Sequence, residues 1–298
     1  MSERSVLVVG EALVDVVHRT DGSVAEHPGG SPANVALGLG RLGRSADLLT
    51  DLGDDAHGAV VRDWLAASGA RLLPTAAGRR TSTATARLRA DGSAVYEFDL
   101  SWAPLGDVDV TAYDVVHTGS IGAVLEPGAG TVRELLTRAK GTAAITYDPN
   151  ARPAIMGDRV ESVRRIEELV ALADLVKVSD EDLAWLYPGV APATVAAEWR
   201  DRGPAVVAVT LGADGVLAVG AAGLVELPAV PTVVVDTVGA GDTFMAALVD
   251  GLLALGLDAV ASDRLEPVLA RAARAAALNV ARPGASPPTL AELGPIEV

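Results

Sequence analysis

The alternation of short, β-rich apolar runs with longer helical stretches is the feature that most limits how this chain can fold. Apolar runs at residues 6–9, 115–117, 144–147, 175–178 and 206–210 alternate with longer segments of helical periodicity. Short runs without an apolar–polar alternation are typical of parallel strands that helices cover on both faces. The sequence therefore predicts an α/β fold around a central, mostly parallel sheet.

Boundary residues predict two helices early in the chain. Ser31 is a favoured N-cap, Pro32 suits the first helical position, and Gly43 ends the segment. A second helix is expected at residues 56–68. Its buried face is expected to comprise Val60, Val61, Trp64 and Leu65.

Residues 81–99 break the alternation of strands and helices. Two strand-like runs flank Asp91-Gly92, a dipeptide that favours a tight hairpin turn. With residues 16–27, this hairpin is expected to form a small sheet that projects from one domain spanning residues 1–298, as a lid. The residues alone also allow an ordinary edge hairpin without a role.

Composition excludes several classes of function. The 39 acidic and 24 basic residues give a formal charge of −15, which argues against nucleic acid and anionic membranes as partners. The absence of cysteine excludes disulfides, thiolate metal sites and cysteine nucleophiles. With neither the apolar region of a signal peptide nor a run of about 20 apolar residues, the expected location is the cytoplasm.

The segment VVVDTVGAGDTF at residues 233–244 points most directly to chemistry. It is expected to be a strand, a glycine-rich turn and a helix running from Asp242 to residue 255. Gly239, Ala240 and Gly241 let several N–H groups face one point, where the helix N-terminus favours negative charge such as that of a transferred phosphoryl group. Asp242 is placed to accept a proton from a substrate hydroxyl, although an Asp there could also simply cap the helix.

The sequence disfavours three other kinds of site. The GxGxxG pattern at residues 38–43 lies at the end of a predicted helix, which excludes a dinucleotide-binding turn. No GxxxxGK[ST] motif occurs, so a P-loop nucleoside triphosphatase is excluded as well. The four histidines show no metal-ligand spacing.

The segments DTVGAGDTF at residues 236–244 and GGSPANVA at 29–36 resemble the two signatures of the ribokinase-like (PfkB) carbohydrate kinases. Further similarity at residues 10–15, 148–152, 210–215 and 281–285 extends the resemblance over nearly the whole chain. It implies a ribokinase-like fold with a small β lid and ATP-dependent phosphorylation of a sugar hydroxyl. In such kinases the Asp matching Asp242 takes the hydroxyl proton, and the amides matching Gly239, Ala240 and Gly241 form an anion hole.

The resemblance also implies which residues bind the sugar. These are Asp15, Gly29, Gly30, Asn34, Arg87, Asp148, Asn150 and Arg152. Carboxylate, amide and backbone groups can satisfy sugar hydroxyls, but the residue types alone also allow a turn cap, a bend and an ordinary helix position. Arg87 and Arg152 are the candidates to hold a substrate carboxylate, and Arg152 could equally pair with a surface acid.

On the nucleotide side, the resemblance implies contacts from Lys177, Ser179, Thr210, Gly212, Gly215 and Asn279. Glu181 and Asp182 match the segment that organises Mg²⁺ through water. Here the sequence departs from the family, because Ser179 and Asp182 stand where Asn and Glu are common. The loop at residues 279–286 resembles one near the adenine and a monovalent cation, so K⁺ is a further candidate.

Fructose is the favoured substrate, because residues 10–15, 29–36 and 148–152 look most like those of fructokinases. 2-Keto-3-deoxygluconate is the runner-up. A nucleoside kinase and a non-catalytic sugar-binding protein remain as alternatives, the former disfavoured by the few aromatic residues. A homodimer is expected, because a small projecting sheet exposes strand edges and apolar surface.

Overall fold

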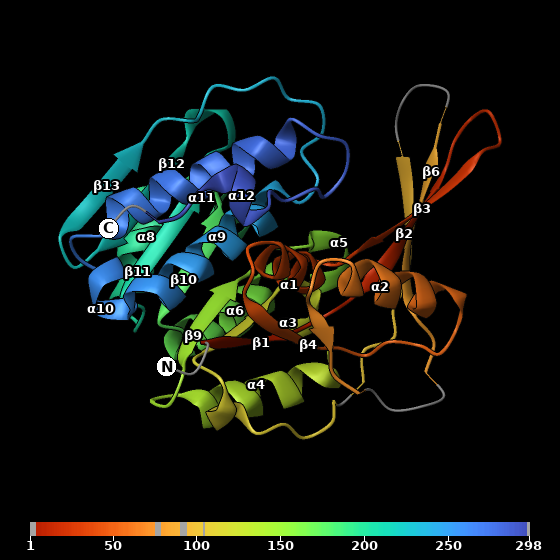
Figure 1. Cartoon of the computed structure of the whole chain (residues 1–298), viewed down its shortest axis with the longest axis horizontal. Coiled ribbons are helices and arrows are strands. Elements are labelled where there is room, and N and C mark those ends of the chain that lie inside the picture. The colour runs from red at the N-terminus through yellow and green to blue at the C-terminus, as the bar shows by residue number, and fades with distance from the viewer. Residues whose placement is uncertain (1–3, 75–78, 90–93, 104, 297–298) are drawn as a thin grey trace.

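In the described part of the chain, helices cover both faces of a nine-stranded sheet, and a four-stranded sheet stands beside it (Figure 1). The computed structural model describes residues 4–74, 79–89, 94–103 and 105–296. Across the large sheet the strands are β13 (Gly223–Leu227), β12 (Val216–Gly220), β11 (Val206–Thr210), β10 (Leu175–Ser179), β9 (Ala144–Asp148), β8 (Val115–Gly119), β1 (Ser5–Val9), β4 (Ser45–Leu49) and β5 (Arg71–Leu72). Neighbours from β11 to β5 are parallel, and only β12 and β13 add antiparallel pairs.

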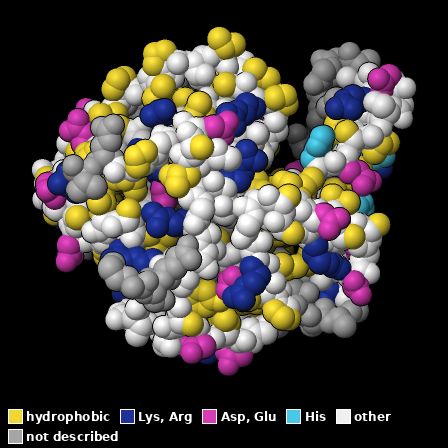
Figure 2. All heavy atoms as spheres, in the orientation of Figure 1, with side chains coloured by type: hydrophobic (Ala, Val, Ile, Leu, Met, Phe, Trp, Pro, Cys, Tyr) yellow, Lys and Arg dark blue, Asp and Glu magenta, His cyan; other side chains and the backbone are white. Residues whose placement is uncertain are grey.

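The second sheet, called the lid sheet from here on, has the order β3-β2-β6-β7. Its strands are β2 (Leu13–His18), β3 (Val24–Gly29), β6 (Ser82–Leu88) and β7 (Ala94–Asp99). The space-filling view shows it standing off the body of the protein with a hollow between them (Figure 2). The predicted separate sheet is thus confirmed, while the turn at Asp91-Gly92 lies outside the described residues.

Twelve α-helices accompany the sheets in the described residues. They are α1 (Ser31–Arg41), α2 (Ala56–Ala66), α3 (Ser120–Val124), α4 (Gly128–Ala139), α5 (Pro153–Met156), α6 (Arg159–Leu172), α7 (Asp180–Leu186), α8 (Pro192–Arg200), α9 (Ala240–Leu255), α10 (Leu257–Val260), α11 (Leu265–Val280) and α12 (Leu290–Leu293). No described helix is both long and apolar enough to cross a membrane.

The strands of the large sheet are apolar throughout because both faces are buried. In β1, Val6 and Val8 pack with α1, α9 and α11, whereas Leu7 and Val9 pack on the opposite face with α4, α6 and α8. Side chains alternate between the two faces of a strand, so each face must supply its own apolar residues. The five predicted strands of this sheet are therefore confirmed.

Three local predictions were wrong. The N-cap of α1 is Gly30, with φ 102°, and Ser31 is the first helical residue. Val60 is 40% exposed, because α2 turns only Val61 and Leu65 fully inward. Residues 233–235 form no strand: the N–H of Val235 donates to the carbonyl of Val280 at the end of α11, not to either sheet.

Candidate active site

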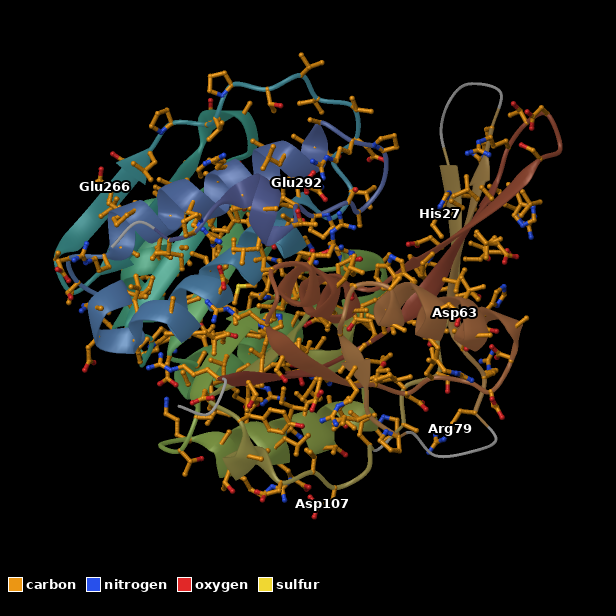
Figure 3. All side chains as sticks on the ribbon, viewed as in Figure 1. His27, Asp63, Arg79, Asp107, Glu266 and Glu292 are labelled. Carbon is orange, nitrogen blue, oxygen red and sulfur yellow. The ribbon has the colours of Figure 1, made fainter. Side chains whose placement is uncertain are left out.

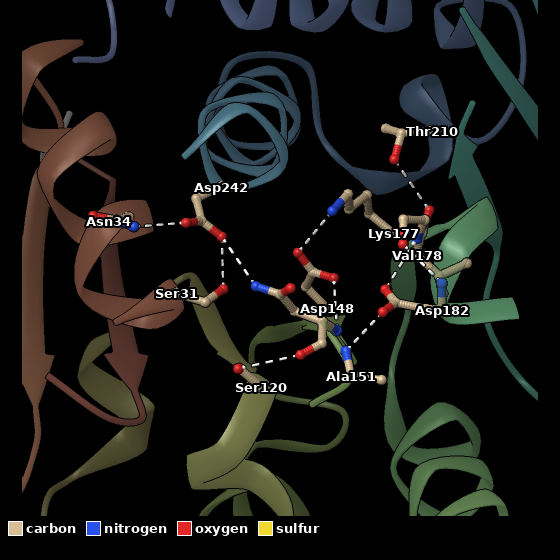
Figure 4. Close-up of polar contacts among 12 residues, drawn as sticks. Ser31, Asn34, Ser120, Asp148, Ala151, Lys177, Val178, Asp182, Thr210 and Asp242 are labelled. Carbon is tan, nitrogen blue, oxygen red and sulfur yellow. Dashed lines mark hydrogen bonds and ion pairs between the residues drawn. The ribbon is translucent and has the colours of Figure 1, made fainter. Parts of the chain in front are cut away.

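The candidate site lies at the edge of the large sheet where its parallel strands end. Asp148 is the last residue of β9 and Ser179 the last of β10, and the N-termini of α1 and α9 meet above them (Figure 4). Open α/β sheets bind ligands at the carboxyl ends of their strands. The topology therefore gathers residues from both predicted signatures, which are some 200 positions apart in the chain.

Asp242 is the centre of this arrangement and is buried, with 7% of its surface exposed. Ser31 Oγ donates to its Oδ1 at 2.7 Å, and Asn34 Nδ2 donates to its Oδ2 at 2.7 Å. Burial raises the pKa of the Asp242 carboxyl, and the hydrogen bonds from Ser31 and Asn34 oppose that rise. The carboxylate is held in place as a proton acceptor by two donors on one face of α1.

The structure does not support a capping role for Asp242. The N-cap of α9 is Gly239, and Asp242, the third residue of the helix, accepts from α1 side chains. Ser31, predicted to cap α1, has its hydroxyl on this carboxylate instead. The i, i+3 spacing of Ser31 and Asn34 at the start of a predicted helix was the available signal.

The turn before α9 has the conformation that an anion site requires. Gly239 has φ 72°, in the left-handed region that favours glycine. The Ala240 amide donates to the carbonyl of Thr237, so it is not free, but among described residues the amides of Gly239, Gly241 and Asp242 donate to no backbone or side-chain acceptor. Free first-turn amides at a helix N-terminus bind anions. The predicted anion hole thus has suitable donors at Gly239 and Gly241.

A buried ion pair lies under the turn. Lys177 Nζ is 3.0 Å from Asp148 Oδ2, and neither side chain is more than 4% exposed. Burial raises the pKa of Asp148 to about 6, an effect that the Lys177 ammonium opposes. Three carboxylates outweigh the effect of burial on Lys177, so its pKa is raised as well.

Asn150 and Arg152 extend from this pair toward solvent. The backbone N–H of Asn150 donates to Asp148 Oδ1 at 3.2 Å, and the side-chain Nδ2 of Asn150 lies 3.4 Å from Asp242 Oδ1. Arg152 is exposed, and its Nη1 donates to Asn150 Oδ1 at 2.7 Å and to nearby carbonyls. Burial raises the pKa of both Asp15 and Asp242, and the positive charge of Arg152 opposes that rise.

Of the two residues predicted to organise a metal, Asp182 is engaged in the protein itself. Asp182 Oδ1 accepts from the Ala151 N–H at 2.8 Å, and Oδ2 accepts from the Ser179 N–H in the capping box of α7. Glu181 is exposed on α7. Among the described residues no three His, Cys, Asp or Glu side chains are grouped to hold a metal. These residues do not fit direct ligation of Mg²⁺, and the predicted contact through water stays a prediction.

The lid sheet brings part of the predicted sugar side into place. Asp15 on β2 pairs with His27 of β3 (labelled in Figure 3), and a Cβ on Gly29 would lie 2.6 Å from Asp15 Oδ2. Burial raises the pKa of Asp15. A Cβ on Gly30 would be 2.6 Å from the Glu11 carbonyl. Gly29 therefore leaves room for the Asp15 carboxyl within the lid sheet, and Gly30 lets the start of α1 approach the backbone of Glu11.

Arg87 is not brought to the site. Asp15 pairs with Ala84, and side chains alternate along a strand, so Arg87 points from the opposite face of the lid sheet. There its Nε lies 3.4 Å from Glu97 Oε2. The prediction that Arg87 meets a substrate carboxylate needed the strand register, which the sequence does not give.

The predicted nucleotide residues line the far side of the turn. Thr210 ends β11, and Gly212 and Gly215 have φ 54° and 103° in the loop that follows. Asn279 is fully buried. Its Nδ2 donates to the Val238 carbonyl, and its Oδ1 accepts from the Ser286 N–H. These residues shape backbone, whereas Lys177 is buried in its ion pair with Asp148.

Glu11 is a buried carboxyl to which the sequence reasoning gave no role. Its Oε2 accepts from the Gly122 N–H at 2.8 Å, and burial raises its pKa to about 7. Ser120, with φ 52°, is also part of this contact and donates to the Asn150 carbonyl at 3.3 Å. A charged residue directly after an apolar strand was the signal that could have identified it.

Comparison with known proteins agrees with this geometry. The pfkB family carbohydrate kinase model matches residues 3–292. A fructokinase of Rhizobium leguminosarum bv. trifolii is 34% identical over 259 residues, which are 83% of this chain and 79% of that protein.

Two solved structures share the fold over nearly the whole chain. Fructokinase of Xylella fastidiosa with bound ATP superimposes with a TM-score of 0.83 at 26% identity, covering 97% of this chain and 96% of that one. Aminoimidazole riboside kinase of Salmonella enterica, complexed with aminoimidazole riboside and an ATP analogue, gives 0.77 at 27% identity and 95% of each chain. Since the family model spans almost every residue and agrees with the fold, this chain belongs to the pfkB family of carbohydrate kinases and is a phosphotransferase.

Proposed function

We propose that this kinase transfers the γ-phosphoryl group of ATP to a hydroxyl of fructose, with Asp242 as the base. The observation that supports it best is the buried Asp242 carboxylate, fixed by Ser31 and Asn34 at the N-terminus of α9. Phosphoryl transfer requires a carboxylate within reach of the acceptor hydroxyl. It also requires free N–H groups that donate hydrogen bonds to the developing negative charge.

The proposed step conserves atoms and charge. The acceptor oxygen forms a bond to the γ-phosphorus while the bond from that phosphorus to the bridging oxygen of ADP breaks. The hydroxyl proton passes to Asp242, and the electron pair of the broken bond leaves with ADP. The amides of Gly239 and Gly241 stabilise charge on the transferring group.

A neutral sugar is favoured over 2-keto-3-deoxygluconate by the positions of the two arginines. Arg87 points from the opposite face of the lid sheet, and Arg152 directs Nη1 to protein oxygens. A substrate carboxylate would need a cation free for bidentate contact. Fructose needs only the acceptors and donors that Asp15, Asn34 and the nearby backbone supply.

A nucleoside acceptor is the second candidate, and one observation favours it. The solved kinase that is complexed with aminoimidazole riboside shares this fold at 27% identity. A panel of fructose, 2-keto-3-deoxygluconate, a nucleoside and no acceptor, with ADP release as the readout, separates the candidates. We expect the highest kcat/KM with fructose and no release without acceptor. Preference for 2-keto-3-deoxygluconate that Arg152→Ala abolishes, or for the nucleoside, would overturn the choice of fructose.

For the metal, we propose that Mg²⁺ enters with ATP and meets the protein through water near Glu181 and Asp182. Direct ligation does not fit, because both Asp182 oxygens accept backbone N–H groups. Activity should be lost with a chelator and return with Mg²⁺. A requirement for K⁺ is tested in the same assay by exchanging K⁺ for a bulky organic cation.

We further propose that the protein is a homodimer that uses the lid sheet. β3 and β7 are its edge strands, and Val24, Val95 and Phe98 are 51%, 38% and 38% exposed. Exposed edges and apolar side chains of this kind favour pairing with a second copy. Light scattering at micromolar concentration should give twice the chain mass, and a monomer mass would contradict the proposal.

A further inference from the structure

Lys177 is an unusual residue for its position in the sheet. The chain contains two lysines, and in the part that the structure describes Lys177 is the only buried lysine or arginine, at 3% exposure. It lies in β10, between strands otherwise lined with apolar residues. Placing a cation there carries a desolvation cost, and replacing a buried ion pair by apolar residues often leaves stability unchanged or higher. Stability alone therefore does not account for the Lys177–Asp148 pair.

The ammonium lies directly behind the turn that begins α9. A Cβ built on Gly241 would be 2.7 Å from Lys177 Nζ, and apart from its chain neighbours and the backbone of its own helix no other residue comes within 4 Å of that Cβ. Figure 4 shows the Lys177 side chain reaching from β10 toward Asp148 and the start of α9. The positive charge is thus buried and close to Gly241.

Charged groups from several elements surround the Lys177 ammonium. Asp148 of β9, Asp182 of α7 and Asp242 of α9 all raise the pKa of Lys177. Toward Asp242, the positive charges come from Lys177 and Arg152, while α1 contributes only the neutral donors Ser31 and Asn34. His117 of β8 is fully buried, and its pKa is lowered chiefly by that burial and further by the Lys177 ammonium. Lys177 is therefore the buried cation in a cluster of carboxylates.

We propose that Lys177 is an electrostatic positioning residue for phosphoryl transfer: its ammonium keeps Asp242 ionised and adds a fixed positive charge behind the Gly241 amide. This inference rests on the proposed function. Lys177 acts on the nucleotide through the turn and not by contact with it. In a site that excludes water, a fixed charge at this distance acts strongly because it is neither solvated nor required to reorganise.

The first test compares Lys177→Met with Lys140→Met. Lys140 is the other lysine, 41% exposed, and pairs with Asp174 at 3.1 Å, so it controls for loss of a lysine charge elsewhere. Lys177→Met should lower kcat at its pH optimum by roughly 10- to 100-fold and move the acid limb of the kcat/KM profile up by about one pH unit. Lys140→Met should do neither. An unmoved acid limb in Lys177→Met would overturn the proposal.

A fold control is needed because Lys177→Met leaves Asp148 buried without its partner. Asp148→Asn and the double variant Asp148→Asn with Lys177→Met are compared by thermal unfolding and by kcat. The double variant should recover much of the lost stability but not the lost kcat, and its kcat should fall several-fold below that of Asp148→Asn. Recovery of kcat together with stability, or equal kcat in the two variants, would show that the pair is only structural.

Gly241→Ala tests whether the position of the Lys177 ammonium matters, without removing its charge. Gly241 lies within α9, where alanine is favourable, and the added Cβ meets only the end of the Lys177 side chain. We expect about tenfold lower kcat in the wild-type background and little further loss in Lys177→Met, whose side chain lacks the displaced atom. Additive losses would overturn the proposal. All rates use the acceptor that the wild type turns over, so a wild type without activity on any acceptor contradicts the proposed function separately.

Discussion

The two halves of the site are built in different ways. The acceptor half, comprising Ser31, Asn34, Asp148, Lys177 and Asp242, consists of buried side chains with defined partners. The predicted nucleotide half, at residues 210–215, is half-buried or exposed at every position. Its geometry comes from the backbone, through glycines with positive φ.

This difference predicts how substitutions behave. Removing one partner of a buried polar pair has a large effect. The group left behind stays buried, and no water replaces the lost hydrogen bond. Exposed backbone turns tolerate changes of side chain as long as their φ values remain accessible. Substitutions in the acceptor half should therefore change rate and pH dependence, and those in the nucleotide half should change little.

The largest effect is expected at Asp242. Asp242→Asn should lower kcat by roughly 10²- to 10⁴-fold, the usual contribution of a positioned base. Stability should change little, because Asn34 Oδ1, which has no partner among the described residues, can accept from the new amide after a flip of the Asn34 side chain. Steady-state kinetics and thermal unfolding measure the two quantities.

A buried carboxyl on the same helix provides the control for Asp242→Asn. Asp250 pairs with Arg44 at 2.5 Å and Arg271 at 2.6 Å, away from the site. Asp250→Asn should lower the melting temperature and leave kcat unchanged. If Asp242→Asn instead kept a near-normal kcat and lost several degrees of melting temperature, its role would be structural.

Glu11 should give the next largest effect, in stability and its pH dependence. Burial raises its pKa from 4.5 to about 7, so between these values the folded state binds more protons than the unfolded state. The free energy of unfolding should therefore fall as pH rises through this window, by up to about 3 kcal/mol from this group. Glu11→Gln removes that contribution. Urea unfolding of both proteins from about pH 5 to pH 8 measures it, and parallel curves would contradict it.

A smaller effect is expected at Ser31. Ser31→Ala removes a donor to the ionised form of Asp242, so the pKa of Asp242 should rise further. The acid limb of the kcat/KM profile should move up by about 0.5 to 1 pH unit, since one such hydrogen bond contributes on the order of 1 kcal/mol. Ser31→Thr keeps the hydroxyl and should keep the wild-type limb. A shift of equal size in both variants would point to packing instead.

The smallest effect is expected in the nucleotide half. The Thr210 hydroxyl makes one long hydrogen bond, 3.5 Å from the Val178 carbonyl. Thr210→Val preserves shape and strand preference, so the KM for ATP should change by less than about threefold. A tenfold increase would break the contrast between the halves, because it would show that this half also depends on a side chain.

Much of the fold follows from local sequence alone. The apolar runs in β1, β8, β9, β10 and β11 predict a buried parallel sheet, because a strand covered on both faces must be apolar at every position. The glycine-rich turn before α9 also follows locally, since few residues other than glycine adopt the left-handed φ found at Gly239. The assignment of Asp242 to the chemistry, by contrast, came from the family resemblance, because a capping Asp gives the same local pattern.

Only the tertiary structure decided which residues act together. Ser31 and Asp242 are 211 positions apart, and their hydrogen bond exists because α1 and α9 begin at the same edge of the sheet. Strand register turned Arg87 away from Asp15. Packing against the end of α11, where the Val235 N–H donates to the Val280 carbonyl, left residues 233–235 outside both sheets. Local periodicity determines which elements form and which face of each is apolar. The partners of a buried polar group depend on the packing of distant elements, which no local pattern encodes.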